Sequence, residues 1–327
     1  MILKRAFGWV DNFVWAMLAV VALAILWPQL GADGGILPVG GASEVGIALI
    51  FFLHGASLSR AALKDGAVNW RLHLLIQSCT FILFPLIGLI VFFLTEGYLP
   101  LEVRLGFFFL CAVSSTVSTS IAMVSIARGN ISAAVFNATL SGLIGLVVTP
   151  VLIGLVSAVG AGSIPIGEAI LDVSVKLLLP FLLGQLAPTA VKALVKQYKP
   201  VISKIDRGVI LLIIYGSFCN SVAEGLWTHY SPTMLLKIFV MTALLLLVVL
   251  TLTTMISRVA GLSKEDEITA VFCGSKKSLA NGAPIAKILF SANPALGMLL
   301  LPLMLYHQLQ LLVCSALARK WAQRPEV

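Results

Sequence analysis

The sequence predicts an all-α polytopic membrane protein with ten transmembrane helices in two inverted five-helix repeats. Composition, the length of the apolar runs and the distribution of positive charge support this fold class. The 327 residues are 59% hydrophobic and only 11% charged, whereas soluble domains carry about 25% charged residues. The apolar runs are about 20 residues long, which is the length that a helix needs to cross the hydrocarbon core.

Ten candidate spans follow one another along the chain, each marked by its own apolar run. They cover residues 11–30, 42–60, 71–94, 103–127, 131–158, 168–190, 207–227, 233–257, 265–289 and 294–318. With the N-terminus inside, 16 of the 22 lysines and arginines fall in inside segments, three outside, and three (Lys176, Lys276 and Lys277) within spans. This bias predicts that both termini are cytoplasmic. The same placement of the charges accounts for the net charge of +8 better than binding to nucleic acid or to anionic lipid would. The expected surroundings are the lipid bilayer, and no nucleic acid is expected as a partner.

The first apolar run is expected to stay in the protein as a span. Lys4 and Arg5 precede it, and it ends at Trp27 and Pro28 without the small-residue site of a cleaved signal.

A Gly/Pro-rich stretch at residues 158–167 separates the fifth span from the sixth. The predicted repeats are therefore residues 1–160 and 161–327. Because five is an odd number, the second repeat enters the membrane from the opposite face, which is a common plan of secondary transporters. The lysine-rich stretch at residues 189–206 is expected to be an ordinary cytoplasmic loop.

Two polar stretches interrupt the apolar pattern at similar distances into the two halves. Span four contains SSTVSTS and span nine contains CGSKKSLAN. Paired interruptions predict a midplane site built from two broken crossing helices, the fourth and the ninth. The residues expected to bind substrate or ion there are Ser114, Ser115, Thr116, Ser118, Thr119, Ser120, Cys273, Ser275, Lys276, Lys277, Ser278 and Asn281.

The two adjacent lysines need a particular explanation, since a charge at a helix centre costs about 2.5–3.5 kcal/mol. Ser263 followed by Asp266 predicts a helix start, which puts Lys276 about 18 Å along the helix, near the bilayer midplane. Adjacent residues of a regular helix point about 100° apart, so at most one lysine faces a given cavity. No acidic residue lies deep in a span. A lysine there is expected to meet backbone carbonyls, polar side chains, water or an anion, or to lose its proton.

Each of these features also has a simpler interpretation. The lysines could lie in a cytoplasmic loop, and the hydroxyls could bond to carbonyls one turn back for helix packing. Other polar residues within spans are typical of helix–helix hydrogen bonds, and His307 and Gln310 share a helix face at i, i+3. We take five of them as cavity-lining candidates: Gln77, Asn137, Asn220, His307 and Gln310. No H-E-x-x-H, P-loop or G-x-G-x-x-G motif occurs, so we expect no enzyme.

Several stretches resemble the bile acid:sodium symporter superfamily, in particular its bacterial members related to the seventh member of human solute carrier family 10. These stretches are IALIFFLHGASLS, NWRLHLLIQ, SSTVSTS, ARGNISAAVFNATLSGLIG and FCGSKKSLANG. The resemblance covers essentially the whole chain, and CGSKKSLA is specific to that branch. It implies panel and core domains, fourth and ninth helices that break and cross, and elevator-like alternating access.

The resemblance also implies where sodium ligands would lie, and this chain differs there. Phe272 stands in place of an acidic residue, and Lys276 and Lys277 stand in place of a Gln-Asn pair. What would remain is an incomplete Na⁺ site near Ser120 and Ser275. Further departures fall in the first crossing and the helix after it, at Ile121, Ala134 and Ala138.

These observations and the resemblance together predict a secondary transporter of an organic, anionic small molecule in the bacterial inner membrane. The expected coupling ion is Na⁺ or H⁺, and no other cofactor is expected. Lys276 is the expected central residue, either as a fixed cation in the place of Na⁺ or as a protonatable coupling group. The alternative is a non-transporting membrane regulator or sensor, for example of calcium homeostasis.

Overall fold

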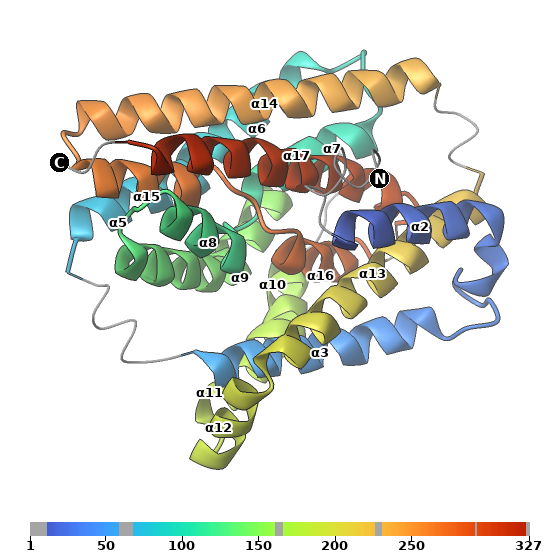
Figure 1. The fold of residues 1–327 in the computed structure, drawn as a ribbon. Helices are drawn as coiled ribbons and strands as arrows, with labels where there is room; N and C mark the ends of the chain where they lie inside the picture. Colours follow the sequence, from blue (N-terminus) through green and yellow to red (C-terminus); the bar gives the residue numbers. More distant parts are fainter. Residues whose placement is uncertain (1–11, 59–67, 161–165, 226–230, 292, 325–327) are drawn as a thin grey trace, which may run out of the picture. The chain divides into compact units, whose positions relative to one another are not determined.

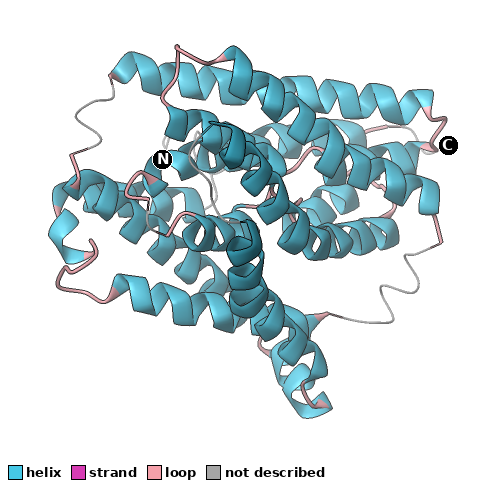
Figure 2. Cartoon of the chain, turned by 180° about the vertical axis from the view of Figure 1, so that it is seen from behind, coloured by secondary structure: helices cyan, strands magenta, loops and turns pink. Residues whose placement is uncertain are grey.

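The computed structural model describes residues 12–58, 68–160, 166–225, 231–291 and 293–324, and every regular element in these ranges is helical (Figure 1, Figure 2). The chain divides into two compact units, and each unit draws on both halves of the sequence. Unit 1 comprises Met1–Leu58, Ile164–Ser231 and Ala283–Leu300, and unit 2 comprises Ser59–Ser163, Pro232–Gly282 and Leu301–Val327. This division in space differs from the predicted repeats 1–160 and 161–327, which remain a prediction about topology.

Most of unit 1 comes from the beginning and the middle of the chain. Its helices are α2 (Asn12–Leu26), η1 (Pro28–Leu30), α3 (Val39–Ser57), α10 (Ile166–Val173), η3 (Ser174–Leu178), α11 (Leu179–Leu186), α12 (Thr189–Gln197) and α13 (Lys199–Ala223). Helix α13 packs against α2 and α3, as the blue and yellow ribbons show (Figure 1). Helices α3 and α11 meet backbone to backbone, because a Cβ atom on Gly55 would overlap the carbonyl oxygen of Phe181, and one on Gly184 would overlap that of Phe52.

The expectation that residues 189–206 form an ordinary loop is wrong. Helix α12 occupies Thr189–Gln197, and α13 begins at Lys199. The physical reason is an amphipathic pattern hidden by the lysines: Lys192 and Lys196 lie one turn apart, while the apolar residues fall on the opposite side of the helix. Pro200, in the first turn of α13, suits a helix start because it has no N–H to leave unpaired.

Unit 2 contains the two polar stretches. Its helices are α5 (Trp70–Ser78), η2 (Cys79–Leu83), α6 (Phe84–Leu94), α7 (Leu101–Ala112), α8 (Ser118–Ile126), α9 (Ile131–Gly160), α14 (Pro232–Val259) and α15 (Lys264–Gly274). Two more, α16 (Leu279–Leu289) and α17 (Leu296–Ala322), each have residues in both units. Helix α15 packs against α5, α8, α9 and α14, so it lies at the core of the unit.

Five helices in the described part of the chain are long and apolar enough to cross a membrane. They are Val39–Ser57, Trp70–Leu94, Ile131–Ser157, Pro232–Val259 and Leu296–Ala322. The segment Ile170–Leu186 with Thr189–Gln197 adds a sixth if this pair, bent by 105°, counts as one span. The protein is therefore an all-helical, multi-pass membrane protein.

Candidate functional site

Both polar stretches break a helix, and the two breaks meet in unit 2. Residues 113–117 separate α7 from α8, and residues 275–278 separate α15 from α16. We call these two non-helical segments the crossing segments. The backbone N–H of Ser278 donates to the Ser114 carbonyl at 2.9 Å, and the Asn281 amide donates to the Ser114 hydroxyl at 2.9 Å. Gly145 of α9 lets a helix backbone approach, since a Cβ there would lie 2.7 Å from the Ser114 Cβ.

The second helix starts as the sequence predicts. The Ser263 side chain accepts a hydrogen bond from the Asp266 backbone N–H at 3.2 Å, and α15 begins at Lys264. The helix then ends at Gly274, so Lys276 and Lys277 lie in the break rather than in a regular helix. Both lysine side chains are fully buried, with 0% exposure. The limit of one lysine per cavity, which assumes a regular helix, does not apply here.

Lys277 has a complete set of acceptors for an ammonium group. Its Nζ donates to the carbonyls of Thr80, Cys111 and Val113 at 3.0, 2.7 and 2.7 Å, and lies 4.1 Å from the centre of the Phe84 ring. A protonated lysine has three N–H donors, so three carbonyls satisfy it fully. The negative end of the α7 dipole lies at the same place, because Cys111 and Val113 are at the C-terminal end of α7.

A local irregularity frees the Thr80 carbonyl for this contact. Residues Cys79–Leu83 form a π-helical turn, in which the Phe84 N–H bonds to the carbonyl of Cys79, five residues back. The same spacing would pair the Thr80 carbonyl with Pro85, which has no N–H. The π-helical turn and the proline together leave an acceptor that the Lys277 ammonium takes.

The Lys276 ammonium has fewer hydrogen-bond acceptors than that of Lys277. Its Nζ donates to the Thr119 carbonyl at 2.9 Å and lies 5.7 Å from the centre of the Phe272 ring. No salt bridge joins it to a carboxylate in the described part of the chain. A buried ammonium with one protein acceptor has two donors left for another ligand.

Hydroxyl groups close the C-terminal end of α15. Each donates to a backbone carbonyl of that end: Ser275 Oγ to Val271, Ser120 Oγ to Phe272, Ser115 Oγ to Cys273, and Tyr306 Oη to Ser275. Two further hydroxyls extend the cluster, since Thr119 donates to Thr116 at 2.8 Å and Thr116 lies 2.7 Å from Ser120. Three of the last carbonyls of α15, those of Val271, Phe272 and Cys273, are thus paired by hydroxyl groups of the protein.

This pairing bears on the Na⁺ site expected near Ser120 and Ser275. Na⁺ would need oxygen lone pairs from those hydroxyls and from the last carbonyls of α15. The carbonyls already accept hydrogens from the same hydroxyls, and the ammonium of Lys277 is bound to the carbonyls at the end of α7. In the described residues, no group of three or more His, Cys, Asp or Glu side chains could hold a metal ion. Each of these carbonyls therefore already has a hydrogen-bond donor of the protein itself.

Side chains of helix α17 form hydrogen bonds with the backbone of the second crossing segment. The Gln310 side chain accepts from the Lys277 N–H at 2.8 Å and donates to the Lys277 carbonyl at 2.8 Å. His307 Nδ1 lies 3.0 Å from the Gln310 amide nitrogen and 3.5 Å from the Lys277 carbonyl. Both candidates on this helix face therefore contact Lys277, although through its backbone.

Other predicted site residues lie elsewhere. Gln77 donates to the side chain and the backbone carbonyl of Asn137, both at 3.2 Å, and Asn137 lies 2.8 Å from the His73 ring. These three form their own cluster in unit 2. Ser118 is exposed at the start of α8, away from the buried hydroxyls.

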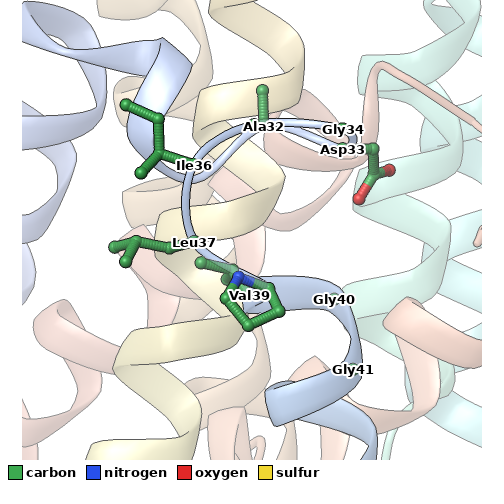
Figure 3. Close-up of a pocket in the computed structure, with 10 residues that line it drawn as sticks. Ala32, Asp33, Gly34, Ile36, Leu37, Val39, Gly40 and Gly41 are labelled. Atoms are coloured by element: carbon green, nitrogen blue, oxygen red, sulfur yellow. The ribbon is translucent and has the colours of Figure 1, made fainter.

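Asn220 belongs to unit 1 and fastens a loop. It accepts from the Asp33 N–H at 2.7 Å and donates to the Asp33 carboxylate at 2.8 Å. This loop lines an open pocket of about 370 Å³ with residues 32–41. Figure 3 shows the Asp33 carboxylate directed away from Ile36 and Leu37. Asn220 thus pairs with Asp33 within unit 1.

Several contacts were not expected from the sequence. The Thr149 hydroxyl donates to the Ala112 carbonyl at 2.9 Å, and the Ser141 hydroxyl accepts from the Ser115 N–H at 2.9 Å. Two aromatic residues were also not expected at the site: Phe84, whose ring faces the Lys277 ammonium, and Tyr306, whose hydroxyl donates to the Ser275 carbonyl. For one of these residues, Thr149, the sequence contains a signal. The next residue, Pro150, marks an irregular place in α9.

The chain is similar to known proteins over almost its whole length. The profile of the SBF-like CPA transporter family matches residues 11–323. An uncharacterized protein of Pseudomonas aeruginosa is 45% identical over 96% of this chain and 93% of its own. The "Putative symporter YfeH" of Escherichia coli is 40% identical over 98% of this chain and 96% of its own. The sodium/bile acid cotransporter 7 of Rattus norvegicus is 29% identical over 93% and 90%.

Proposed function

The chain belongs to the SBF-like CPA transporter family, and on that premise we propose that it carries an organic anion across the bacterial inner membrane by alternating access. The proposed topology has ten spans in two inverted repeats, with both termini cytoplasmic. The inside location of 16 of the 22 basic residues supports it. The matching breaks of α7–α8 and α15–α16 support the repeats.

One observation carries the proposed mechanism: the ammonium of Lys277 is bound by three carbonyls and an aromatic face. Carbonyl-lined helix breaks of this kind are where secondary transporters coordinate Na⁺. In this chain, Lys277 takes that role as a covalently attached cation, which offsets the negative end of the α7 dipole. Transport is then independent of Na⁺.

Lys276 provides the positive charge for the substrate. Its ammonium is buried and has the Thr119 carbonyl as its one hydrogen-bond acceptor among the described residues. A buried charge is stable only when it is paired. A carboxylate or sulfonate of the substrate supplies the missing pairing when the site opens to it.

The test is transport by the full chain in proteoliposomes. A radiolabelled bile acid and a panel of small carboxylates are followed in counterflow, once in NaCl and once in choline chloride. We expect exchange of an anion at equal rates in both salts, loss of exchange in Lys276→Gln and Lys277→Gln, and wild-type exchange in the control Lys176→Gln. Lys176 is a suitable control because it is exposed and paired with Asp172 at 3.7 Å.

Each result has a distinct meaning. Exchange that requires Na⁺ would refute the fixed-cation role of Lys277. Wild-type exchange in both lysine variants would refute the site assignment. Binding of an anion without counterflow would favour a sensor or regulator over a transporter.

A further inference from the structure

Helix α12 is an amphipathic helix that turns away from the span before it. Helix α11 ends at Leu186, and the next helix, Thr189–Gln197, is bent by 105° from it. Pro188 explains the turn, because a proline pushes the residue before it into extended backbone, and Ala187 has φ −57° and ψ 147°. A helix that bends sharply at the end of a span is positioned to run along the membrane surface.

The segment from Leu186 to Lys204 exposes large apolar side chains. Val195 is buried, and α12 packs against α3 and α13 of its own unit, so one side of the helix is fixed. Four neighbours remain exposed: Leu186 by 75%, Leu194 by 55%, Tyr198 by 48% and Val201 by 50%. We call these four side chains the apolar patch.

The same segment is strongly basic. It contains four lysines and no acidic residue. Lys192 donates to the Gln185 carbonyl at 2.6 Å and so caps the end of α11. Lys196, Lys199 and Lys204 are exposed, and no salt bridge involves them in the described part of the chain. Asp206, just beyond the segment, faces His54 at 3.5 Å.

We propose that residues 186–204 lie in the membrane interface and bind anionic phospholipid. The apolar patch enters the region between headgroups and acyl chains, while the three lysines extend to the lipid phosphates. An amphipathic helix with lysines on its polar face is the usual form of such a surface. The orientation of spans during insertion explains positive charge in a cytoplasmic connection, but it requires neither a helix nor exposed leucine and tyrosine.

The test measures which lipids the purified full chain retains. The protein is extracted from membranes of phosphatidylcholine and phosphatidylglycerol, and the bound lipids are counted by native mass spectrometry. One lysine near an anionic surface changes lipid occupancy by a factor of about 5. The triple variant Lys196→Gln/Lys199→Gln/Lys204→Gln is therefore expected to lose phosphatidylglycerol retention at least tenfold, with phosphatidylcholine unchanged.

Two controls make the result decisive. The same three lysines replaced by arginine keep the charge and are expected to retain the lipid. The variant Lys237→Gln/Lys320→Gln removes exposed lysines elsewhere and is expected to behave as wild type. Undiminished retention in the triple glutamine variant, equal loss in the Lys237/Lys320 control, or loss in the arginine variant would each overturn the proposal.

Discussion

Replacing Lys277 by methionine removes the ammonium from the three carbonyls and keeps an unbranched apolar chain of similar volume. Lys276→Met is its matched control, because both lysines are fully buried and adjacent in sequence. Each substitution also removes the cost of burying an ammonium, so that term largely cancels when the two variants are compared. The difference between them then reports the partners of the two ammonium groups.

The structure sets the size of that difference. Lys277 donates three hydrogen bonds and Lys276 donates one. Hydrogen bonds to a charged group contribute roughly 1.5–3 kcal/mol each, so the two additional bonds give about 3–6 kcal/mol. The shorter distance to an aromatic ring, 4.1 Å against 5.7 Å, acts in the same direction. We expect the free energy of unfolding of Lys277→Met to lie at least about 3 kcal/mol below that of Lys276→Met.

The measurement is reversible unfolding in mixed micelles, with circular dichroism followed over increasing SDS. Wild type and both variants are compared at one detergent composition. If Lys276→Met is as unstable as Lys277→Met, or less stable, the two lysines do not differ as the geometry requires. The assignment of Lys277 as the fixed cation would then be abandoned.

Three further predictions follow from other contacts in the two units. Gly55→Ala should lower the free energy of unfolding by about 1–3 kcal/mol, because its new methyl overlaps a backbone carbonyl of α11. Gly41→Ala in the same helix meets open space and should be neutral or stabilising by up to about 1 kcal/mol; equal thermal midpoints for the two variants would contradict the packing argument. Gln310→Leu should destabilise by about 2–4 kcal/mol in the SDS titration, since it removes the acceptor of the Lys277 N–H and the nearer of the two groups at the Lys277 carbonyl. Ser315→Ala on the same helix serves as the unaffected comparison. Lys277→Asn should gain stabilisation by Na⁺, seen as a higher thermal midpoint in NaCl than in choline chloride, because it leaves three carbonyls open to a free cation. Wild type should show no such difference, and a salt response equal to that of the asparagine variant would count against a tethered cation.

The sequence was sufficient to locate the two helix breaks. SSTVSTS and the lysine pair marked places where an apolar helix is energetically implausible, and the breaks occur at residues 113–117 and 275–278. Their contact in unit 2 agrees with the expectation that corresponding stretches of the two halves come together. The ten-span topology itself remains a prediction.

The sequence does not show which of the two lysines has more hydrogen-bond acceptors for its ammonium group. Lys276 was expected to be central, yet Lys277 has the three carbonyl partners. That outcome depends on the path of the chain after α15 ends and on the carbonyl of Thr80, which a π-helical turn and Pro85 release together. Neither the angle of a break nor a change of helical repeat follows from hydrophobic periodicity alone. Helix α12 has a lysine-rich composition that is typical of a loop, and this composition conceals its amphipathic pattern.

The distance in sequence between the two crossing segments has a consequence for biosynthesis. Val113 and Lys277 are 164 residues apart, and ribosomes add about 5–20 residues per second. Roughly ten seconds or longer therefore pass between the synthesis of the carbonyls at the end of α7 and that of the lysine whose ammonium binds them. Helix α7 has 12 residues and spans only about 18 Å, too little to cross the hydrocarbon core unaided. We therefore expect α7 to stay with the insertion machinery, or at the membrane surface, until residues 264–278 have been made. Nascent chains stopped after Val259 should be far more sensitive to protease than chains that continue past Ser278.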